Sequence, residues 1–328
     1  MKHCAAALCL AAGLAVGAVP ALQAAQVGSF HRQLTVSGPV VLYVGTGSGS
    51  IHVTGTPGSA VTIDATISDN GGFWFNSPDP KLIRQIEDHP PIEQSGNTIR
   101  IERPHDSWFE HLSISYLITT PPDTELHANA GSGAVEAGGL KGNADLQTGS
   151  GHIRVEDING SVRAGTGSGG IEFGQITGDA RLTTGSGSIR GGSIGGHVYA
   201  STGSGHISMN GIGQGGEVHT ASGGMDLDGV NGDLNAHSSS GGVRVGGTLG
   251  GQNQWRIGAA SGSIEITLPQ STFTEARLDT ASGSIHVGLP QRDSQIGRHS
   301  WSGVIGSRSG SPTAMLVASA ASGSITVN

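Results

Sequence analysis

The sequence has very little cysteine. Among its 328 residues there are two cysteines, Cys4 and Cys9, and both lie within the first ten positions. If that segment is removed, no disulfide can form. Stability must then come from a continuous apolar core and from ladder hydrogen bonds.

Basic charge is also scarce. Lys and Arg total 17 against 25 Asp and Glu, a formal net charge of −8 that becomes one unit more negative without Lys2. Such a balance repels nucleic acid and anionic lipid surfaces, so we expect neither as a partner. It also helps to keep a protein rich in strand edges soluble.

Long apolar runs are limited to one, from Cys4 to Val19. It is too short to span a bilayer comfortably, and no stop-transfer pattern follows, so we expect no stable membrane insertion. Preceded by Lys2 and followed by small residues up to Ala24, it is typical of a secretory signal peptide over residues 1–24. The mature protein is expected to be exported, to the periplasm or to the cell surface and medium.

Glycine, by contrast, is abundant, with 57 residues, and much of it lies in a Ser-Gly marker that recurs at a constant spacing. Apolar and polar residues alternate on both sides of each marker, which predicts strands with one buried face. So short a unit cannot bury its apolar face alone, so the units must stack. We therefore predict an all-β fold, a parallel β-solenoid (β-helix) of about ten coils with an 18-residue repeat. The marker serines are Ser132, Ser150, Ser168, Ser186, Ser204, Ser222 and Ser240.

The residues four positions after these serines alternate in charge. In a solenoid they stack at intervals of roughly 4.8 Å, so opposite charges become neighbours. We interpret this column as a stabilising surface ladder rather than a binding site. Its members are Glu136, Arg154, Glu172, Arg190, Ser208, Asp226, Arg244 and Glu265.

The repeat is interrupted near both ends, which suggests three regions: the signal peptide 1–24, N-terminal strands with a capping insertion over 25–125, and solenoid repeats with C-terminal loop insertions over 126–328. The first marker, Gly47–Val53, precedes an aromatic insertion from Ser68 to Asp123. Within it, Lys81–Glu87 is predicted to be a short helix. Near the C-terminus, Pro290–Pro312 is predicted to be a long loop before a closing strand at 323–327.

Four aromatic residues in these interruptions are candidate ligand-binding residues. An open end of a solenoid needs a cover, and apolar residues are more often core than site, so capping is the favoured role of the insertion. The alternative is a platform for sugar stacking. The candidates are Trp74, Trp108, Tyr116 and Trp301.

No catalytic constellation stands out. His219 and His237 lie one repeat apart and could stack, but two ligands are too few for a tight metal site. Gly165–Gly170 matches GxGxxG without a following helix, so no dinucleotide site is implied. The marker serines recur in every unit, which favours a hydrogen-bonding role at the corners over a nucleophile. We expect no enzyme activity, cofactor or metal; the residues to test for a hydrolase or lyase are Asp226, Asp228 and Asp233.

Three stretches, YLITTPPDTELHANAGSG, GSGAVEAGGLKGNADLQTGSGHIRVEDINGSV and ASGSITVN, resemble the bacterial putative adhesin family of exported β-helical domains of unknown function. The resemblance covers residues 36–328 and implies a β-helix at the cell envelope, with no catalytic residues to carry over. We expect a non-catalytic adhesin-like or envelope-scaffolding protein that binds an envelope or surface polysaccharide or a protein. The alternative is a polysaccharide-active enzyme. The oligomeric state is not predicted.

Overall fold

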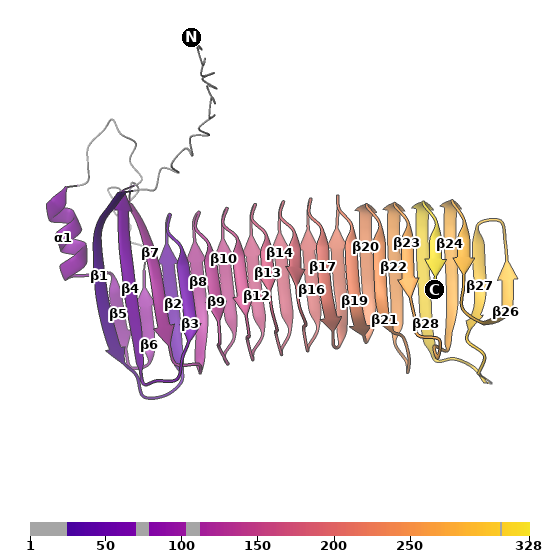
Figure 1. Cartoon of the computed structure of the whole chain (residues 1–328), viewed down its shortest axis with the longest axis horizontal. Coiled ribbons are helices and arrows are strands. Elements are labelled where there is room, and N and C mark those ends of the chain that lie inside the picture. Colours follow the sequence, from indigo (N-terminus) through magenta and orange to yellow (C-terminus); the bar gives the residue numbers. More distant parts are fainter. Residues whose placement is uncertain (1–24, 70–78, 103–111, 309) are drawn as a thin grey trace, which may run out of the picture.

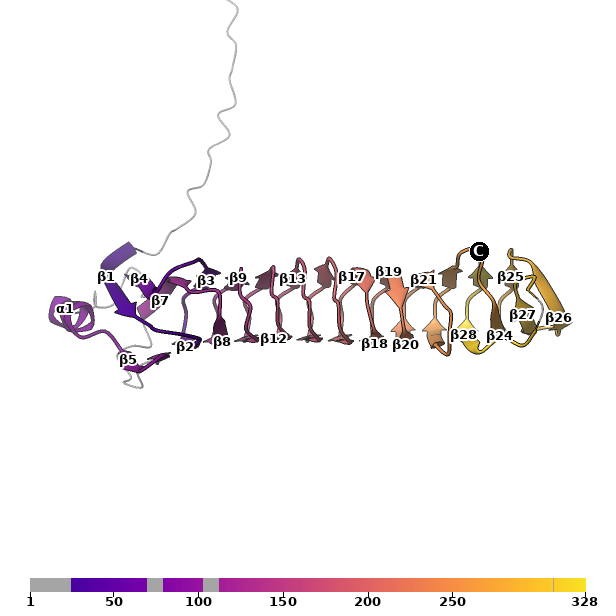
Figure 2. The ribbon, with the colours of Figure 1, turned by 90° about the horizontal axis from the view of Figure 1, so that it is seen from below.

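The computed structural model describes residues 25–69, 79–102, 112–308 and 310–328. Two long sheets face each other, and in the central coils each turn of the chain contributes one parallel strand to each sheet (Figures 1 and 2). At the ends, antiparallel strands extend the sheets. The predicted all-β parallel solenoid is confirmed. The predicted signal peptide lies outside the described residues.

Sheet A has 14 strands and sheet B has 15. In spatial order, sheet A contains β1 (Ala25–Thr35), β4 (Ala60–Asp69), β7 (Leu112–Thr120), β3 (Ile51–Gly55), β9 (Val135–Gly138), β11 (Ile153–Glu156), β13 (Ile171–Phe173), β15 (Ile189–Gly191), β17 (Ile207–Ile212), β19 (Met225–Asn231), β21 (Val243–Thr248), β23 (Ile264–Thr267), β29 (Ile325–Val327) and β25 (Ile285–Val287).

The strands of sheet B are given from the C-terminal end of the molecule to the N-terminal end. It contains β26 (Gln291–Ile296), β27 (Ser300–Ile305), β24 (Thr274–Ser282), β28 (Ala314–Ser322), β22 (Gln254–Ser261), β20 (Asp233–Ser240), β18 (Gly215–Thr220), β16 (Val198–Thr202), β14 (Ala180–Thr184), β12 (Val162–Thr166), β10 (Ala144–Thr148), β8 (Thr124–Ala130), β2 (Val40–Thr46), β6 (Thr98–Ile101) and β5 (Ile92–Ser95). The predicted boundary between residues 125 and 126 falls within β8.

The constant length of the repeat sets the register of the central coils. Ile153 pairs with Ile171 in sheet A, and Leu182 pairs with Ala164 in sheet B, in each case exactly one repeat along the chain. These side chains point between the sheets and are at most 1% exposed. Because the same inward positions repeat, the core is continuous from coil to coil.

The turn from sheet B to sheet A is held by threonine hydroxyls. Thr166 donates to the carbonyl of Gly151 in the neighbouring coil at 2.8 Å and accepts the N–H of Gly169 at 3.1 Å. The same donor bond recurs at Thr148, Thr184, Thr202, Thr220 and Ser238. The sequence predicted that the marker serines form the hydrogen bonds at this corner, and that was wrong. The hydroxyl comes from the buried residue two positions earlier, a threonine in all but one of these coils, and the marker serines are exposed.

Glycine is required where the turns stack most closely. A Cβ placed on Gly169 would lie 1.8 Å from the carbonyl oxygen of Gly151, and one on Gly187 would lie 1.9 Å from that of Gly169. Real Cβ atoms do not approach so closely, so any side chain would force the coils apart. The column of glycines in the marker is therefore a packing requirement.

At the N-terminal end the order of coils differs from the order of the chain. The coil β2–β3 lies between β6–β7 and β8–β9, with parallel pairing on both sides. The three residues from Pro121 to Asp123 join β7 to β8 past this inserted coil. They are fixed by the Val40 N–H, which donates to Asp123 O at 2.9 Å, and by the hydrogen-bonded hydroxyls of Thr120 and Thr124.

The C-terminal end repeats this arrangement. The last coil of the chain, β28–β29, lies between β22–β23 and β24–β25, so Ser322 pairs with both Ser261 and Ser282. The segment Pro290–Pro312 was predicted to be a long loop, and that was wrong. It contains the antiparallel hairpin β26–β27, which pairs with the edge of β24 and covers this end of sheet B (Figure 1).

The predicted helix at Lys81–Glu87 is confirmed as α1 (Pro80–Asp88). Asp79 caps its N-terminus by accepting the Lys81 N–H at 2.9 Å, and Pro80 suits the first helical position. Ile83 and Ile86 are buried. The helix packs on β1 at the outer N-terminal end, close enough that a Cβ on Gly28 would meet Ile83 at 2.5 Å.

Candidate functional site

A column of outward side chains crosses sheet B at the same position of successive coils. We call it the central column. It begins with aromatic and basic residues near the N-terminal end and continues through an aspartate and a pair of arginines. A tyrosine, an acidic group, an amide group and a final arginine follow. Its members are Arg100, Tyr43, His127, Asp145, Arg163, Arg181, Tyr199, Glu217, Asn235 and Arg256.

A groove of about 820 Å³ follows this column from β8 to β22. Neighbouring strands are about 4.8 Å apart, so seven steps give a length of roughly 34 Å. A second hollow of about 620 Å³ continues from His127 and Asp145 toward Tyr43 and Arg100. The two hollows share His127 and Asp145, so together they form one long, shallow surface across the strands.

The two tyrosines of the column have ring faces already in contact with protein groups. Tyr43 is stacked on His127 with centroids 4.7 Å apart, and the Arg100 guanidinium lies 4.0 Å from the centre of the same ring. Arg181 lies 4.1 Å from the ring centre of Tyr199. The groove therefore offers hydroxyl, amide, carboxylate and guanidinium groups more than open aromatic faces.

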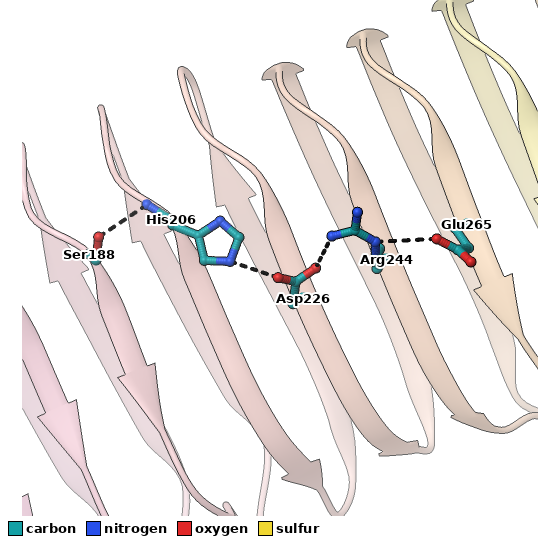
Figure 3. A network of polar contacts seen from close by, with 5 residues as sticks. All are labelled: Ser188, His206, Asp226, Arg244 and Glu265. Carbon is teal, nitrogen blue, oxygen red and sulfur yellow. Dashed lines mark hydrogen bonds and ion pairs between the residues drawn. The ribbon is translucent and has the colours of Figure 1, made fainter.

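Sheet A carries a different surface, in which charges are paired (Figure 3). Arg244 lies between Asp226 at 3.1 Å and Glu265 at 3.2 Å, and the bond to Asp226, followed by that to Glu265, raises the pKa of this guanidinium. His206 Nε2 contacts Asp226 at 3.0 Å, and the backbone N–H of His206 donates to the Ser188 hydroxyl at 3.3 Å. This part of the predicted ladder is confirmed as a polar network.

The ladder is less regular farther along sheet A. Arg154 bonds Glu156 on its own strand at 2.9 Å instead of bridging to the neighbouring coils, and this bond raises its pKa. Glu136 is contacted by His52 at 2.9 Å and by His152 at 3.7 Å. Local geometry therefore decides which of the stacked charges pair.

The four predicted ligand-binding aromatics do not come together in the described structure. Trp74 and Trp108 lie outside the described residues. Tyr116 is 2% exposed and meets Phe30 edge-on at 6.4 Å, and burial raises the pKa of its hydroxyl. Trp301 is 4% exposed and donates its indole N–H to Gln291 at 2.9 Å. Both described side chains thus lie in the core, beneath the two ends, and ligand binding by this set stays a prediction.

The other candidates are placed plainly. His219 and His237 are neighbours in sheet B, as predicted. Within the described ranges no three His, Cys, Asp or Glu side chains are grouped so as to hold a metal ion. Asp226 and Asp228 lie on β19 in sheet A, while Asp233 begins β20 in sheet B and accepts the Gln254 N–H at 2.7 Å. These three carboxylates are therefore divided between two sheets.

The groove residues were missed by the sequence reasoning, although a signal was present. His127, Asp145, Arg163, Arg181 and Tyr199 follow one another at the same constant spacing as the serine markers. Aligning every position of the unit, and not only the position four residues after the serine, would have placed them in one column.

Comparison with solved structures gives matches of low identity. A putative adhesin from Bacteroides fragilis is 11% identical, with 95% of this chain and 100% of that chain covered and a TM-score of 0.33. A putative cell adhesion protein from Clostridium sporogenes is 9% identical, with 91% and 98% covered and a TM-score of 0.21. A putative lipid binding protein from Parabacteroides distasonis is 13% identical, with 92% and 97% covered and a TM-score of 0.38.

No curated protein matches the chain. In the described parts of the molecule, no helix has both the length and the apolarity needed to cross a membrane. A family model does match the C-terminal part of the solenoid, from the turn before β16 to the end of the chain. Residues 195–328 match the Toastrack DUF4097 family, and over this part of the chain the predicted resemblance to a β-helical family is confirmed.

Proposed function

We propose that this protein is an exported, non-catalytic binding protein of the cell envelope that holds a linear polysaccharide along the groove of sheet B. The observation that supports this is the continuity of the groove from β8 to β22 across successive coils. A periodic polymer laid along it would meet an equivalent position about every 4.8 Å.

The chemistry of the lining suits a polar polymer. Glu217 and Asn235 lie next to each other in the central column, and Asp145 and His127 lie farther along it. Carboxylate, amide and imidazole groups together accept and donate the hydrogen bonds that saccharide hydroxyls make. The shallow shape agrees with binding along the length of a chain rather than with enclosure of a small molecule.

Export is proposed from the sequence of residues 1–24, and the absence of catalysis from the placement of the acidic candidates. Asp226 lies in sheet A and is engaged by Arg244 and His206, whereas Asp233 lies in sheet B. Glycoside hydrolysis needs two carboxyl groups that flank one bond. Asp226 and Asp233 lie on different sheets and cannot flank one bond. Asp226 and Asp228 share β19, but Asp226 is held by Arg244 and His206.

The test is binding of purified residues 25–328 to envelope polysaccharide, peptidoglycan and host glycans, measured by affinity electrophoresis. Asn235→Trp places a bulky side chain in the groove, and Asn210→Trp makes the same change on the outer face of sheet A. We expect binding that is lost in the first variant and kept in the second. Equal loss in both, or release of new reducing ends by the native protein, would contradict the proposal.

A further inference from the structure

The strongest signal in the groove is a pair of like charges. Arg163 and Arg181 are register partners on β12 and β14 in the middle of the central column. Like charges opposite one another destabilise a sheet, and sheet A shows the usual solution, with Arg244 set between two carboxylates. In sheet B, by contrast, the two arginines are direct register neighbours with no carboxylate between them.

In the part of the chain that the structure describes, neither arginine is held in an ion pair, although Asp145 is the register neighbour of Arg163. Among the described residues, neither guanidinium lies within 4.0 Å of a carboxylate, and neither donates a hydrogen bond to another protein group. Two carboxylates line the groove near the pair: Asp145, the register neighbour of Arg163, accepts a hydrogen bond from Gln147 at 3.0 Å, and Asp179 accepts the His197 N–H at 2.8 Å. The Arg181 guanidinium instead lies on the ring of Tyr199.

The charges on either side limit what the pair can bind. Toward β8 the groove is lined by Glu125 and Asp145, and toward β22 by Glu217 and Asp233, with Arg256 at its end. A polymer with a negative charge on every unit would meet these carboxylates as well as the arginines, and the whole chain carries a net charge of −8. An isolated negative group between neutral units could lie at the arginine pair and would meet fewer of these carboxylates.

We propose that Arg163 and Arg181 bind one anionic group, a carboxylate or a phosphate, carried by an otherwise neutral saccharide chain in the groove. Arginine presents a fork of N–H donors that matches both anions. Two guanidinium groups on adjacent strands can donate hydrogen bonds to the same anion. The hydroxyls of the flanking saccharide units would bond to the carboxylate and amide groups of the groove. This inference rests on the proposed function and names its ligand class.

The experiment compares three probes by calorimetry with residues 25–328. They are an aldotetrauronic acid, which carries one carboxylate on neutral sugars, its methyl ester, and polygalacturonate. We expect the acid to bind at least roughly tenfold more tightly than the ester, as for a hydrogen-bonded charge, and polygalacturonate to bind weakly. Inorganic phosphate and acetate as competitors identify the preferred anion, because the better competitor carries the better-matched group.

Arg163→Gln and Arg181→Gln should each reduce the preference for the acid over its ester, and the double variant should abolish it. Arg154→Gln, on sheet A, is the matched control and should leave it unchanged. Equal affinity for acid and ester, or a preference kept in the double variant, would overturn the inference but leave saccharide binding intact. Binding of no saccharide, with or without charge, would overturn both the inference and the proposed function.

Discussion

Thr184 donates a hydrogen bond from its hydroxyl to the carbonyl oxygen of Gly169, in the preceding coil, at 2.7 Å. The same hydroxyl accepts the N–H of Gly187 at 3.1 Å. One side chain thus joins the turn of its own coil to the turn of the preceding coil. Repetition of this bond along the stack links the turns from sheet B to sheet A of the central coils without a disulfide.

Replacement of Thr184 by Val should therefore destabilise the fold. The shape is kept, but the carbonyl of Gly169 and the N–H of Gly187 lose their partner, which costs about 1–3 kcal/mol for buried groups. Urea unfolding followed by circular dichroism measures the change. Thr177→Val, at an exposed turn position, is the control, and an equal effect of the two substitutions would refute the role of the corner bond.

Gly187→Ala should be costly because the added Cβ would lie 1.9 Å from the carbonyl oxygen of Gly169. We expect a loss of about 1–3 kcal/mol, as for overpacking in a close-packed region. Gly250→Ala is the matched control, since a Cβ there has no heavy atom within 4 Å. Thermal unfolding compares the two, and similar melting temperatures would contradict the packing argument.

The inserted last coil should stabilise both of its neighbours. Leu316 on β28 is 0% exposed and pairs with Trp255 on β22 and with Ala276 on β24. Leu316→Ala leaves a cavity that costs about 2–5 kcal/mol. Hydrogen exchange should become faster in both β22 and β24, while exposed Ser319→Ala should change neither. Faster exchange in only one of the two strands would show that β28 does not stabilise both neighbours.

Stability should fall at high pH because of Tyr116. Burial raises the pKa of its hydroxyl above the ordinary 10.0, so the folded state holds the proton where the unfolded chain releases it. The contribution is complete below pH 10 and decreases as the pH rises above it. As the pH rises above 10, the urea midpoint should drop more steeply in the native protein than in Tyr116→Phe. Parallel curves would show that this hydroxyl does not contribute.

The paired charges of sheet A should have only a modest effect. Arg244 is 68% exposed, so water and salt screen its bonds to Asp226 and Glu265. Arg244→Gln should lower the urea midpoint slightly at low salt, and the difference from the native protein should vanish at high salt. A difference that persisted at high salt would mean that the side chain acts through packing.

The groove of sheet B was not predicted from the sequence. The sequence drew attention to the aromatic residues, yet Tyr116 and Trp301 lie in the core, because large apolar rings near the ends of an open stack are needed to cover it. The arginine pair in the groove went unnoticed because Arg163 and Arg181 are ordinary exposed residues one at a time. Only their register makes them unusual.

The sequence by itself determined the coil. A repeat of constant length, alternating apolar positions and glycines at the corners allow one regular stack, since each inward position recurs on the next coil. The order of coils at the two ends was decided by the tertiary structure. The strand β28 pairs between β22 and β24, and β2 between β6 and β8, because a strand edge takes any partner of matching register. Local patterns carry the shape of a coil, whereas its neighbours in space depend on which edges remain open.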